Sequence, residues 1–399
     1  MSLPLLHETC TKDKCVLLRV DLNVPILDGV VQDFTRIARI KPTIDFLTKE
    51  GAKIVLLSHF GRPKGKREMQ YSLKPLIEVL ENILNKQIIF VEDPITEDQS
   101  ARARHLKSNE ILLLENTRFY LGEEANDLEF AKNLARYGDI YVNDAFSASH
   151  RAHASVDKIT QILPSFAGLS LQNEMDSLKA LLENPKRPIA AIVGGAKIST
   201  KINLLENLVT KVNSLIIGGG MANSFLAAQS IKVGKSLCET GVEEIIENIL
   251  KKAKQHNCTI ILPLDAVVAY QFKAEAPHQF FDIQDLPSDG MVLDIGPHSI
   301  EQAKSILDIS ATLLWNGPLG AFELSPFDHG TLTIAKYAAQ LTTEKKLLSI
   351  AGGGDTISAL KKAEVLDKFS YVSTAGGAFL EWLEGKELPG ITALKKQKQ

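Results

Sequence analysis

Short apolar runs alternate with longer amphipathic segments along the whole chain. Val16–Val20 and Lys53–Leu57 are apolar runs of the kind that form buried strands. Between them, Thr35–Lys49 carries apolar residues at helical spacing, and Leu73–Leu84 predicts the next helix. The same rhythm restarts at Ile189. Strands that alternate with helices predict βαβ units and a parallel sheet covered by helices. The apolar positions of the first helix are Ile37, Ile40, Ile44 and Leu47.

The length of the chain predicts two domains. It has 399 residues, which is more than one hydrophobic core usually supports. The predicted fold class is α/β, with two doubly wound parallel-sheet (Rossmann-like) domains that face each other across a cleft. We place the domains at residues 1–167 and 188–383, joined by a helix within 168–187. Leu171–Leu182 carries the helical pattern of this connector, and Asn184-Pro185 ends it.

Composition and charge exclude several classes of partner. Hydrophobic residues make up 45% and charged residues 23% of the chain, and the net charge is −3. This balance is ordinary for a soluble protein and provides no overall attraction to nucleic acid or to a membrane. No apolar run approaches about 18 residues and no signal pattern occurs, so we expect a cytoplasmic protein. The cysteines have no metal-site or C-x-x-C spacing, which favours free thiols.

In the second half of the chain, four apolar runs end in glycine clusters. They lie at 194–195, 218–220, 352–354 and 376–377, whereas the first 167 residues hold only 6 of the 26 glycines. A glycine cluster between a strand and a helix lets backbone N–H groups approach an anion, and the helix adds partial positive charge. One cluster is equally typical of a tight turn without a ligand, but four favour a phosphate-rich ligand.

Two standard nucleotide signatures are absent. Gly234-Lys235-Ser236 resembles the end of a P-loop, but Gln229 stands where that motif requires glycine. No complete G-x-G-x-x-G follows a predicted strand, which argues against a dinucleotide fold. A bound nucleotide would therefore use another cradle.

Charged residues near the glycine clusters are candidate ligands. Lys197 and Lys201 are four residues apart, which would place both on one helix face beside a glycine turn. Glu323 offers a carboxylate to ribose hydroxyls. Asp355 either caps its own helix, the more common role, or holds Mg²⁺ through nucleotide phosphates. A solvated lysine pair and an ordinary surface glutamate are the alternatives.

In the first half, the apolar runs are followed by charged and hydrogen-bonding residues instead of glycine. Arginine recognises phosphate and carboxylate with paired hydrogen bonds, so several converging arginines predict a site for a small polyanion. A single arginine is more often part of a surface ion pair. His150 and His153 lack a third ligand at suitable spacing, which argues against a metal site. The residues expected at or just after strand ends are Arg36, His59, Arg62, Arg118 and Arg151, with Asp21 and Asn23 beside them.

These two kinds of site predict phosphoryl transfer. No activated serine or cysteine nucleophile is evident, and phosphoryl transfer needs none, because positioning and neutralisation of charge supply most of the catalysis. A nucleotide lobe opposite a polyanion lobe predicts a kinase that closes around its two substrates. A kinase for another small carboxylate acceptor and a non-catalytic nucleotide-binding protein are the alternatives.

Seven motifs, which follow one another along nearly the whole chain, resemble those of the phosphoglycerate kinase family. The resemblance implies the reversible reaction of 1,3-bisphosphoglycerate with ADP to give 3-phosphoglycerate and ATP, with Mg²⁺, and it implies a monomer. The motifs are RVDLNVP (Arg19–Pro25), SHFGRP (Ser58–Pro63), LENTRF (Leu114–Phe119), HRAHAS (His150–Ser155), GGAKISTK (Gly194–Lys201), WNGPLGAFE (Trp315–Glu323) and AGGGDT (Ala351–Thr356).

By motif match, the resemblance also implies a role for each candidate residue of the first half and for Lys197 of the second. Asp21 and Asn23 would hold the hydroxyl and carboxyl end of the 3-phosphoglycerate. Arg36 would stabilise the transferring phosphoryl group, and Lys197 would follow that group from donor to acceptor. The residues that would bind the carboxyl group and the distal phosphate are His59, Arg62, Arg118 and Arg151.

The resemblance implies a nucleotide site in the second half. Lys201 would bind nucleotide phosphates, Glu323 the ribose, and Asp355 would lie nearest Mg²⁺. Asn316 and Gly296 would line the pocket. The phosphates and the metal-bound nucleotide would contact Gly353, Gly354, Asp355 and Thr356, and the transition state would receive amides from Gly376 and Gly377.

One residue departs from the family pattern. Leu22 stands in the first motif where the family usually has an aromatic residue, and we expect altered packing there without loss of chemistry. The resemblance also implies that the C-terminal tail, residues 384–399, returns to the first domain.

Overall fold

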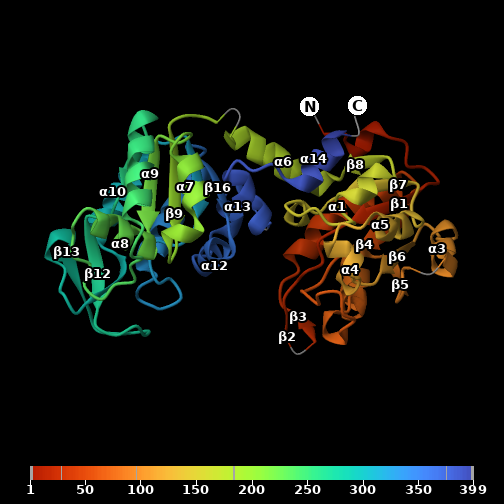
Figure 1. Ribbon diagram of the computed structural model, residues 1–399, viewed down its shortest axis with the longest axis horizontal. Coiled ribbons are helices and arrows are strands. Elements are labelled where there is room, and N and C mark those ends of the chain that lie inside the picture. Colours follow the sequence, from red (N-terminus) through yellow and green to blue (C-terminus); the bar gives the residue numbers. More distant parts are fainter. Residues whose placement is uncertain (1–2, 28, 96, 183–184, 374, 397–399) are drawn as a thin grey trace. The chain divides into compact units, whose positions relative to one another are not determined.

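The computed structural model describes residues 3–27, 29–95, 97–182, 185–373 and 375–396. The chain folds as two compact units (Figure 1). Unit 1 consists of Met1–Asp176 and Glu387–Gln399, and unit 2 of Ser177–Lys386. The division lies inside helix α6 (Leu169–Leu182), within the segment where we expected a connecting helix.

Unit 1 is built on a sheet of six parallel strands in the order β5-β6-β4-β1-β7-β8. β1 and β4 pair in register from Cys15 and Lys53 onward. Both are almost wholly buried, which explains their nearly continuous apolar sequences. The parallel sheet predicted for this half is confirmed. Its strands are β1 (Cys15–Arg19), β4 (Lys53–Leu57), β5 (Gln87–Val91), β6 (Glu110–Leu114), β7 (Ile140–Asn143) and β8 (Ser165–Ala167).

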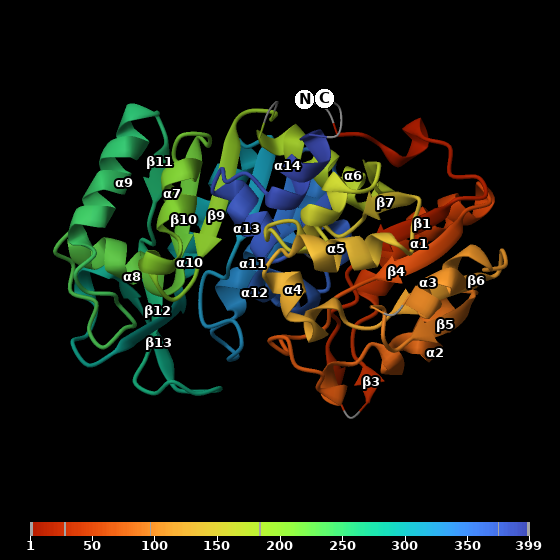
Figure 2. The same cartoon turned by 45° about the vertical axis from the view of Figure 1, so that its right-hand side comes forward.

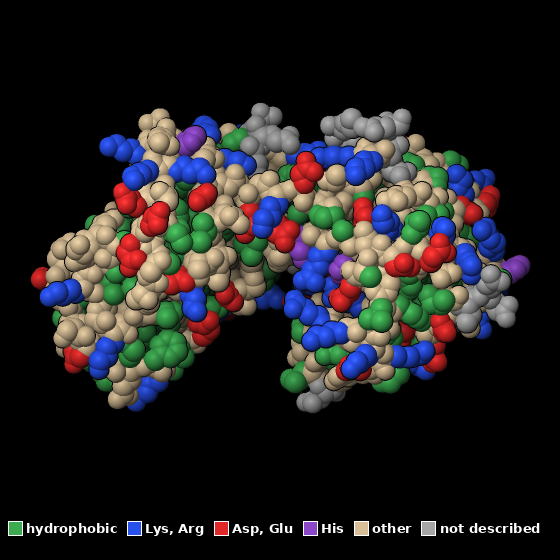
Figure 3. Space-filling view, in the orientation of Figure 1, with side chains coloured by type: hydrophobic (Ala, Val, Ile, Leu, Met, Phe, Trp, Pro, Cys, Tyr) green, Lys and Arg blue, Asp and Glu red, His purple; other side chains and the backbone are tan. Residues whose placement is uncertain are grey.

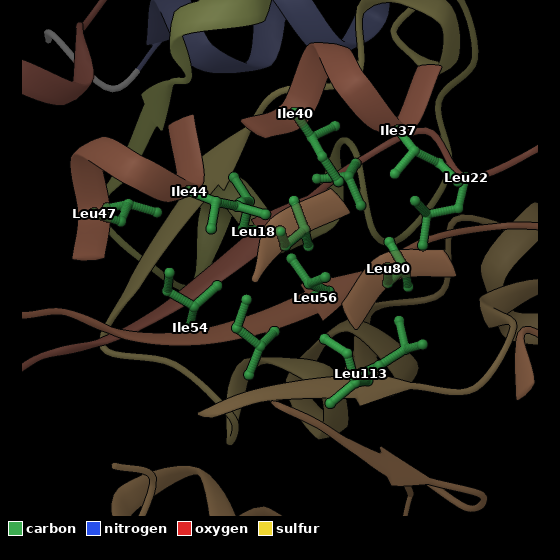
Figure 4. Close-up of a cluster of buried hydrophobic side chains, with 14 of the residues drawn as sticks. Leu18, Leu22, Ile37, Ile40, Ile44, Leu47, Ile54, Leu56, Leu80 and Leu113 are labelled. Atoms are coloured by element: carbon green, nitrogen blue, oxygen red, sulfur yellow. The ribbon is translucent and has the colours of Figure 1, made fainter. Parts of the chain in front are cut away.

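Helices cover both faces of the unit 1 sheet. The apolar face of α1 packs on one face of the sheet, where Ile37 and Ile44 join a buried cluster with Leu18 and Leu56 (Figure 4). Helices α3 and α5 supply side chains to a second cluster, on the alternate strand positions of the opposite face. The helices of unit 1 besides α6 are α1 (Thr35–Lys49), α2 (Ile77–Leu84), α3 (Glu97–Arg104), α4 (Leu121–Glu124), α5 (Leu128–Ala135) and α14 (Pro389–Lys395).

The C-terminal helix α14 belongs to unit 1. Its amide at Gly390 donates to the carbonyl oxygen of Ser149 at 2.9 Å. A Cβ at Gly390 would lie 2.6 Å from a methyl group of Val156, so glycine permits this close packing. Leu394 is fully buried. These contacts hold the described end of the chain against the first unit.

Short elements complete the two units. The predicted helix Leu73–Leu84 begins as the 3-10 turn η3, and α2 starts only at Ile77. A small antiparallel hairpin, β2 (Ile26–Leu27) and β3 (Val30–Val31), precedes α1. The 3-10 turns are η1 (Leu6–Glu8), η2 (Met69–Tyr71), η3 (Lys74–Leu76), η4 (Thr117–Phe119), η5 (Phe146–Ala148), η6 (Lys158–Gln161), η7 (Ile198–Thr200), η8 (Ile283–Asp285) and η9 (Leu366–Lys368).

Unit 2 repeats the architecture with its own sheet of six parallel strands, in the order β11-β10-β9-β15-β16-β17. Helices α10, α11 and α12 cover one face around Trp315, which is almost completely buried. The strands are β9 (Ile189–Gly194), β10 (Ser214–Gly218), β11 (Thr259–Ile261), β15 (Thr312–Asn316), β16 (Leu348–Gly352) and β17 (Tyr371–Ser373). The helices are α7 (Ile202–Leu208), α8 (Gly219–Ala228), α9 (Glu243–Gln255), α10 (Pro297–Asp308), α11 (His329–Thr343), α12 (Gly354–Lys362) and α13 (Gly377–Leu383).

Unit 2 also contains a three-stranded antiparallel sheet that the sequence pattern did not indicate. It consists of β12 (Asp265–Ala269), β13 (His278–Asp282) and β14 (Met291–Ile295), in the order β13-β12-β14. No α-helix lies between Asp265 and Ile295, and strands joined without a helical crossover pair antiparallel. This sheet projects below the main sheet of unit 2 in the view of Figure 2.

Candidate functional site

A cavity of about 550 Å³ opens in unit 2 beside the strand-to-helix turns that carry glycine. Its lining is largely apolar, with Leu226, Leu237 and Leu293 among its walls, and it includes the carboxylate-bearing residues Glu323 and Asp355. Ligands of open α/β sheets bind outside the carboxyl ends of the strands, and the loops that follow β9, β10 and β15 contribute to this lining.

Close backbone packing explains why glycine occupies these turns. A Cβ on Gly194 would collide with the carbonyl oxygen of Pro318. Gly353 has a φ of +100°, in the region that favours glycine, and it is the N-cap of α12. The amides of the first turn of α12 have no partner inside the helix. Because Gly354 leaves open space where a Cβ would stand, an anion can approach these amides closely.

Lys201 holds two of these turns together. Its Nζ donates to the carbonyl oxygen of Gly194 at 2.6 Å and to Oδ1 of Asn316 at 2.7 Å. Burial lowers the pKa of Lys201 to about 8, and the carboxylate of Asp355 opposes that shift. The ammonium therefore lies where β9 and β15 end, near Asp355, one of the acidic residues of the cavity lining.

The predicted shared helix face of Lys197 and Lys201 is wrong. Lys197 is exposed and extended, with φ −136° and ψ 135°, immediately before η7. Lys201 lies between η7 and α7, which begins only at Ile202. Because no continuous helix joins the two residues, the four-residue spacing does not align their side chains.

Asn316 and Thr356 connect neighbouring strand ends. The Nδ2 of Asn316 donates to the carbonyl oxygen of Gly352 at 2.8 Å. The Oγ1 of Thr356 accepts from the amide of Gly317 at 2.7 Å. Both side chains are buried, so they fix the turns after β15 and β16 relative to each other.

Of the site residues predicted for the second half, only Glu323 and Asp355 line the cavity. The predicted residues outside its lining are Lys197, Lys201, Gly296, Asn316, Gly353, Gly354, Thr356, Gly376 and Gly377. Gly296 is the N-cap of α10, packed against the carboxylate of Asp265. Gly376 and Gly377 lie at the start of α13, at the end of the sheet where β17 stops. Conversely, the cavity lining includes residues to which the sequence analysis gave no role: Gly219, Gly220, Asn223 and Lys235. The glycine cluster and the incomplete P-loop pattern were the available signals for three of them.

In unit 1, the loop after β1 meets the start of α1. The Nη1 of Arg36 lies 2.8 Å from Oδ2 of Asp21 and donates to the carbonyl oxygen of Asn23 at 2.9 Å. The Oδ1 of Asn23 accepts from the amide of Gly61 at 2.9 Å, which joins the loops after β1 and β4. Arg36 is in the first turn of α1, so its predicted place at a strand end is wrong. The turn of α1 nevertheless brings it to that edge.

His59 and Arg118 occupy the same edge of unit 1. Arg118 donates from Nη1 to the carbonyl oxygen of Gly61 at 2.8 Å, and its Nε lies 3.4 Å from Oε1 of Glu124. Burial first, and then neighbouring guanidinium groups, lower the pKa of Arg118 to about 10. Burial and the nearby arginines hold the pKa of His59 well below its ordinary value. At neutral pH, Arg118 is therefore charged and His59 is neutral.

The remaining basic residues extend this edge. Arg151 contributes to the lowered pKa of Arg118, which indicates that the two guanidinium groups are close. The Nε of Arg151 also lies 3.2 Å from Nε2 of His150. Arg62 is exposed, three residues before a chain reversal at Gly65. Figure 3 shows Lys and Arg side chains gathered along one edge of unit 1 beside histidine.

The first motif also contains a residue without a predicted role. Arg19 is fully buried at the end of β1. Leu22, the departure from the family pattern, is fully buried as well and joins the cluster that contains Ile37 and Leu80 (Figure 4). Its amide donates to Ser58 Oγ at 2.9 Å. The leucine therefore fills a core position behind the charged edge.

Across the described residues, no group of three or more His, Cys, Asp and Glu side chains is arranged to hold a metal ion. The helices in the described part of the chain also include none with the length and apolar character needed to span a bilayer.

Known proteins resemble the chain over nearly its whole length. The family model described as phosphoglycerate kinase matches residues 6–386. A phosphoglycerate kinase of Chelativorans sp. is 57% identical over 383 residues, which cover 96% of each chain. The structure of phosphoglycerate kinase from Coxiella burnetii has a TM-score of 0.91 at 39% identity and covers 100% of both chains. That of Pyrococcus horikoshii has a TM-score of 0.83 at 28% identity, over 99% of each chain. The chain therefore belongs to the phosphoglycerate kinase family and is a phosphotransferase that uses a carboxyl group as acceptor.

Proposed function

We propose that unit 1 binds 3-phosphoglycerate or 1,3-bisphosphoglycerate at its basic edge and that unit 2 binds ADP or ATP in its glycine-bordered cavity. The family's reaction is reversible transfer of the acyl phosphate of 1,3-bisphosphoglycerate to ADP. The observation that carries our assignment is the contrast between the two sites. One gathers guanidinium groups, whereas the other is a largely apolar cavity bordered by bare backbone amides.

The basic edge suits a small dianion with a carboxyl end. Guanidinium groups that lie close together repel one another, and a bound phosphate removes that repulsion while accepting paired hydrogen bonds. Burial is the largest cause of the lowered pKa of Arg118, and repulsion from the Arg19 and Arg151 guanidinium groups adds to it. We assign the phosphate and carboxylate to Arg62, Arg118, Arg151 and His59, and the substrate hydroxyl to Asp21 and Asn23.

The cavity of unit 2 suits a nucleotide. Its apolar walls offer a surface for the base, and the exposed carboxylate of Glu323 offers acceptors to the ribose hydroxyls. The phosphates would meet the amides at Gly353 and Gly354 and the positive end of α12. Lys201 lies beside the same turns and supplies positive charge.

The carboxylate of Asp355 and the phosphate oxygens of a bound nucleotide are together suitable ligands for Mg²⁺. Mg²⁺ is usually held by one or two carboxylates together with phosphate oxygens. Asp355 is exposed, lies at the start of α12 and contributes to the cavity lining. It would hold the ion, which would neutralise charge on the phosphates.

Transfer requires the acyl phosphate to meet the terminal phosphate of ADP. A phosphate oxygen of ADP forms the new P–O bond while the bond to the acyl oxygen breaks, and the carboxylate of 3-phosphoglycerate leaves with that electron pair. We assign stabilisation of the transferring group to Arg36, Lys197 and the amides of Gly376 and Gly377. Lys197 is exposed, so its ammonium is available to the moving phosphoryl group. We further propose that the protein acts as a monomer in the cytoplasm.

A coupled assay tests the reaction directly. We expect ATP to form from ADP only when 1,3-bisphosphoglycerate and Mg²⁺ are both present, and the reverse reaction to consume 3-phosphoglycerate. Activity on another small carboxylate, with none on 3-phosphoglycerate, would contradict the acceptor assignment.

A further inference from the structure

Arg19 is a fully buried arginine whose three nitrogens all have partners. Its Nε donates to Ser155 Oγ at 3.0 Å and its Nη1 donates to the carbonyl oxygen of Val20. Its Nη2 lies 3.1 Å from Nδ1 of His59. No role in the acceptor site proposed above uses this residue.

The direction of the Arg19–His59 hydrogen bond follows from chemistry. A guanidinium group has only donors and keeps its charge in proteins. The Nδ1 atom of His59 must therefore present its lone pair to Nη2 of Arg19. A proton on Nδ1 would place two N–H donors against each other in a buried site, which is costly. The imidazole of His59 then carries its proton on Nε2.

We propose that Arg19 is a positioning residue that holds His59 as the neutral tautomer with its proton on Nε2. His59 then offers one fixed, uncharged hydrogen-bond donor to the anionic acceptor. This inference rests on the proposed assignment of His59 to the 3-phosphoglycerate site. A free imidazole is distributed among two neutral tautomers and one cation. A ligand that binds only one of these forms therefore has an apparent affinity reduced by the fraction of the imidazole in that form.

Arg19 is itself held by a buried carboxylate. The hydroxyl of Ser155 accepts from Nε of Arg19 and donates to Oε1 of Glu123 at 2.6 Å. The amide of Ser155 donates to the other oxygen of Glu123 at 3.0 Å. Glu123 is fully buried, so its charge balances that of Arg19 across the serine. The guanidinium orientation is therefore built into the fold before any ligand arrives.

The charged groups around His59 also oppose a second proton. Burial is the largest cause of its lowered pKa, followed by four neighbouring side chains, Arg19, Arg118, Arg36 and His153. We therefore expect the single tautomer to persist from about pH 5 to about pH 8, where an ordinary histidine titrates.

Nitrogen-15 NMR of the full-length protein, labelled at histidine, tests the tautomer. Signals of His59 are assigned from the spectrum of His59→Gln, in which they are missing. We expect the unliganded protein to have an unprotonated Nδ1 and a protonated Nε2 over the range from about pH 5 to about pH 8. A His59 that carries its proton on Nδ1, or that titrates within this range, would overturn the proposal.

Two variants separate positioning from general support of the fold. Arg19→Met removes the donor, and we expect both tautomers of His59 and an increase of about tenfold in the KM for 3-phosphoglycerate, with the KM for ATP unchanged. Ser155→Ala is the matched control, because it removes the partner of Nε while Nη1 still donates to the carbonyl oxygen of Val20, which keeps Nη2 beside Nδ1 of His59. We expect it to keep the single tautomer.

An unchanged His59 tautomer in Arg19→Met would refute the positioning role. The NMR measurement needs no substrate, so its result is independent of the kinase assay. A wild-type protein without activity on 3-phosphoglycerate would refute the proposed function and leave the tautomer to be decided by its own spectrum.

Discussion

The Nη1 atom of Arg36 lies 2.8 Å from Oδ2 of Asp21, which joins the first turn of α1 to the loop after β1. Asp21 also accepts a hydrogen bond from the hydroxyl of Ser147, which follows β7. Three segments that are distant in sequence therefore meet at one carboxylate. This arrangement holds the Arg36 guanidinium at the edge of the sheet where the acceptor is proposed to bind.

Replacing Arg36 with alanine tests its role in the transition state. If this guanidinium stabilises the transferring phosphoryl group, Arg36→Ala lowers kcat by about 10²–10³-fold, the loss typical of one key electrostatic donor. Steady-state kinetics with ADP and 1,3-bisphosphoglycerate measures the change. Lys41→Ala is the control on the same helix, where Lys41 pairs with Asp45 at 2.8 Å on the exposed surface, and we expect unchanged kcat. Wild-type kcat in Arg36→Ala would exclude the role.

Arg62 provides a test of the two separate binding sites. Arg62→Ala removes one charged donor from the basic edge, so we expect the Kd for 3-phosphoglycerate to rise about tenfold. The Kd for ADP stays the same, because Arg62 belongs to unit 1. Titration calorimetry with each ligand measures both constants. The control is Arg67→Ala. In the wild-type protein, the guanidinium of Arg67 lies 3.8 Å from Glu92. Equal losses for the two ligands would contradict the assignment of one ligand to each unit.

The lowered pKa of Lys201 predicts a pH dependence of nucleotide binding. Burial lowers this pKa to about 8, so the charged fraction falls as pH rises through about 8, where an ordinary lysine is still protonated. Because nucleotide phosphates favour the charged form, the affinity for ADP decreases over this interval and binding takes up protons. Calorimetry in buffers of different ionisation enthalpy detects that uptake.

Lys201→Arg is the control for this pH dependence. Arginine stays charged over the same range, so we expect the variant to bind ADP without proton uptake near pH 8. Identical proton uptake in the wild type and in Lys201→Arg would show that another group is responsible.

Gly194 provides a test of the close turn beneath the cavity. Gly194→Ala forces a methyl group against the carbonyl oxygen of Pro318, and we expect the free energy of unfolding to fall by about 1–3 kcal/mol, as in other overpacked sites. Urea denaturation measures the change. Gly354→Ala is compared for stability only, since open space surrounds its Cβ position, and we expect no loss there. Equal stability of Gly194→Ala and the wild type would mean that the turn accommodates the methyl group without a loss in the free energy of unfolding.

The sequence predicted the parts of the fold that depend on local pattern. The apolar face of α1, from Ile37 to Leu47, is buried as the helical spacing indicates. The parallel sheets follow from the alternation of strands and helices. The antiparallel sheet around β12 was not predicted, because its edge strand β13 is mostly exposed and lacks an apolar pattern. Pairing with β12, which is buried throughout, stabilises it.

In the candidate site too, local sequence predicts some features, and tertiary packing decides others. Motif order predicted Asp21, Arg36 and Asp355 as site residues, because the chemistry of phosphate recognition restricts which residue types are suitable, and these three roles stay predictions. The relation between Lys197 and Lys201 was predicted wrongly, since it depends on whether a helix begins at 198 or at 202. Local spacing cannot decide this, because the segment also depends on tertiary packing, such as that of Gly194 against Pro318 in the loop after β15.

By itself, the sequence determined the fold class through its local periodicity and the family through its motifs, and it predicted two kinds of anion site, because pattern and residue type can be recognised without tertiary contacts. Only the tertiary structure decided how buried charges are paired. In the sequence alone, Arg19 is an unexplained charge in an apolar strand. The fold brings Ser155 and His59, which are 136 and 40 residues away in sequence, within hydrogen-bonding distance of it. A buried charge must find partners wherever the fold supplies them, and those partners are chosen by the three-dimensional packing of strands and loops.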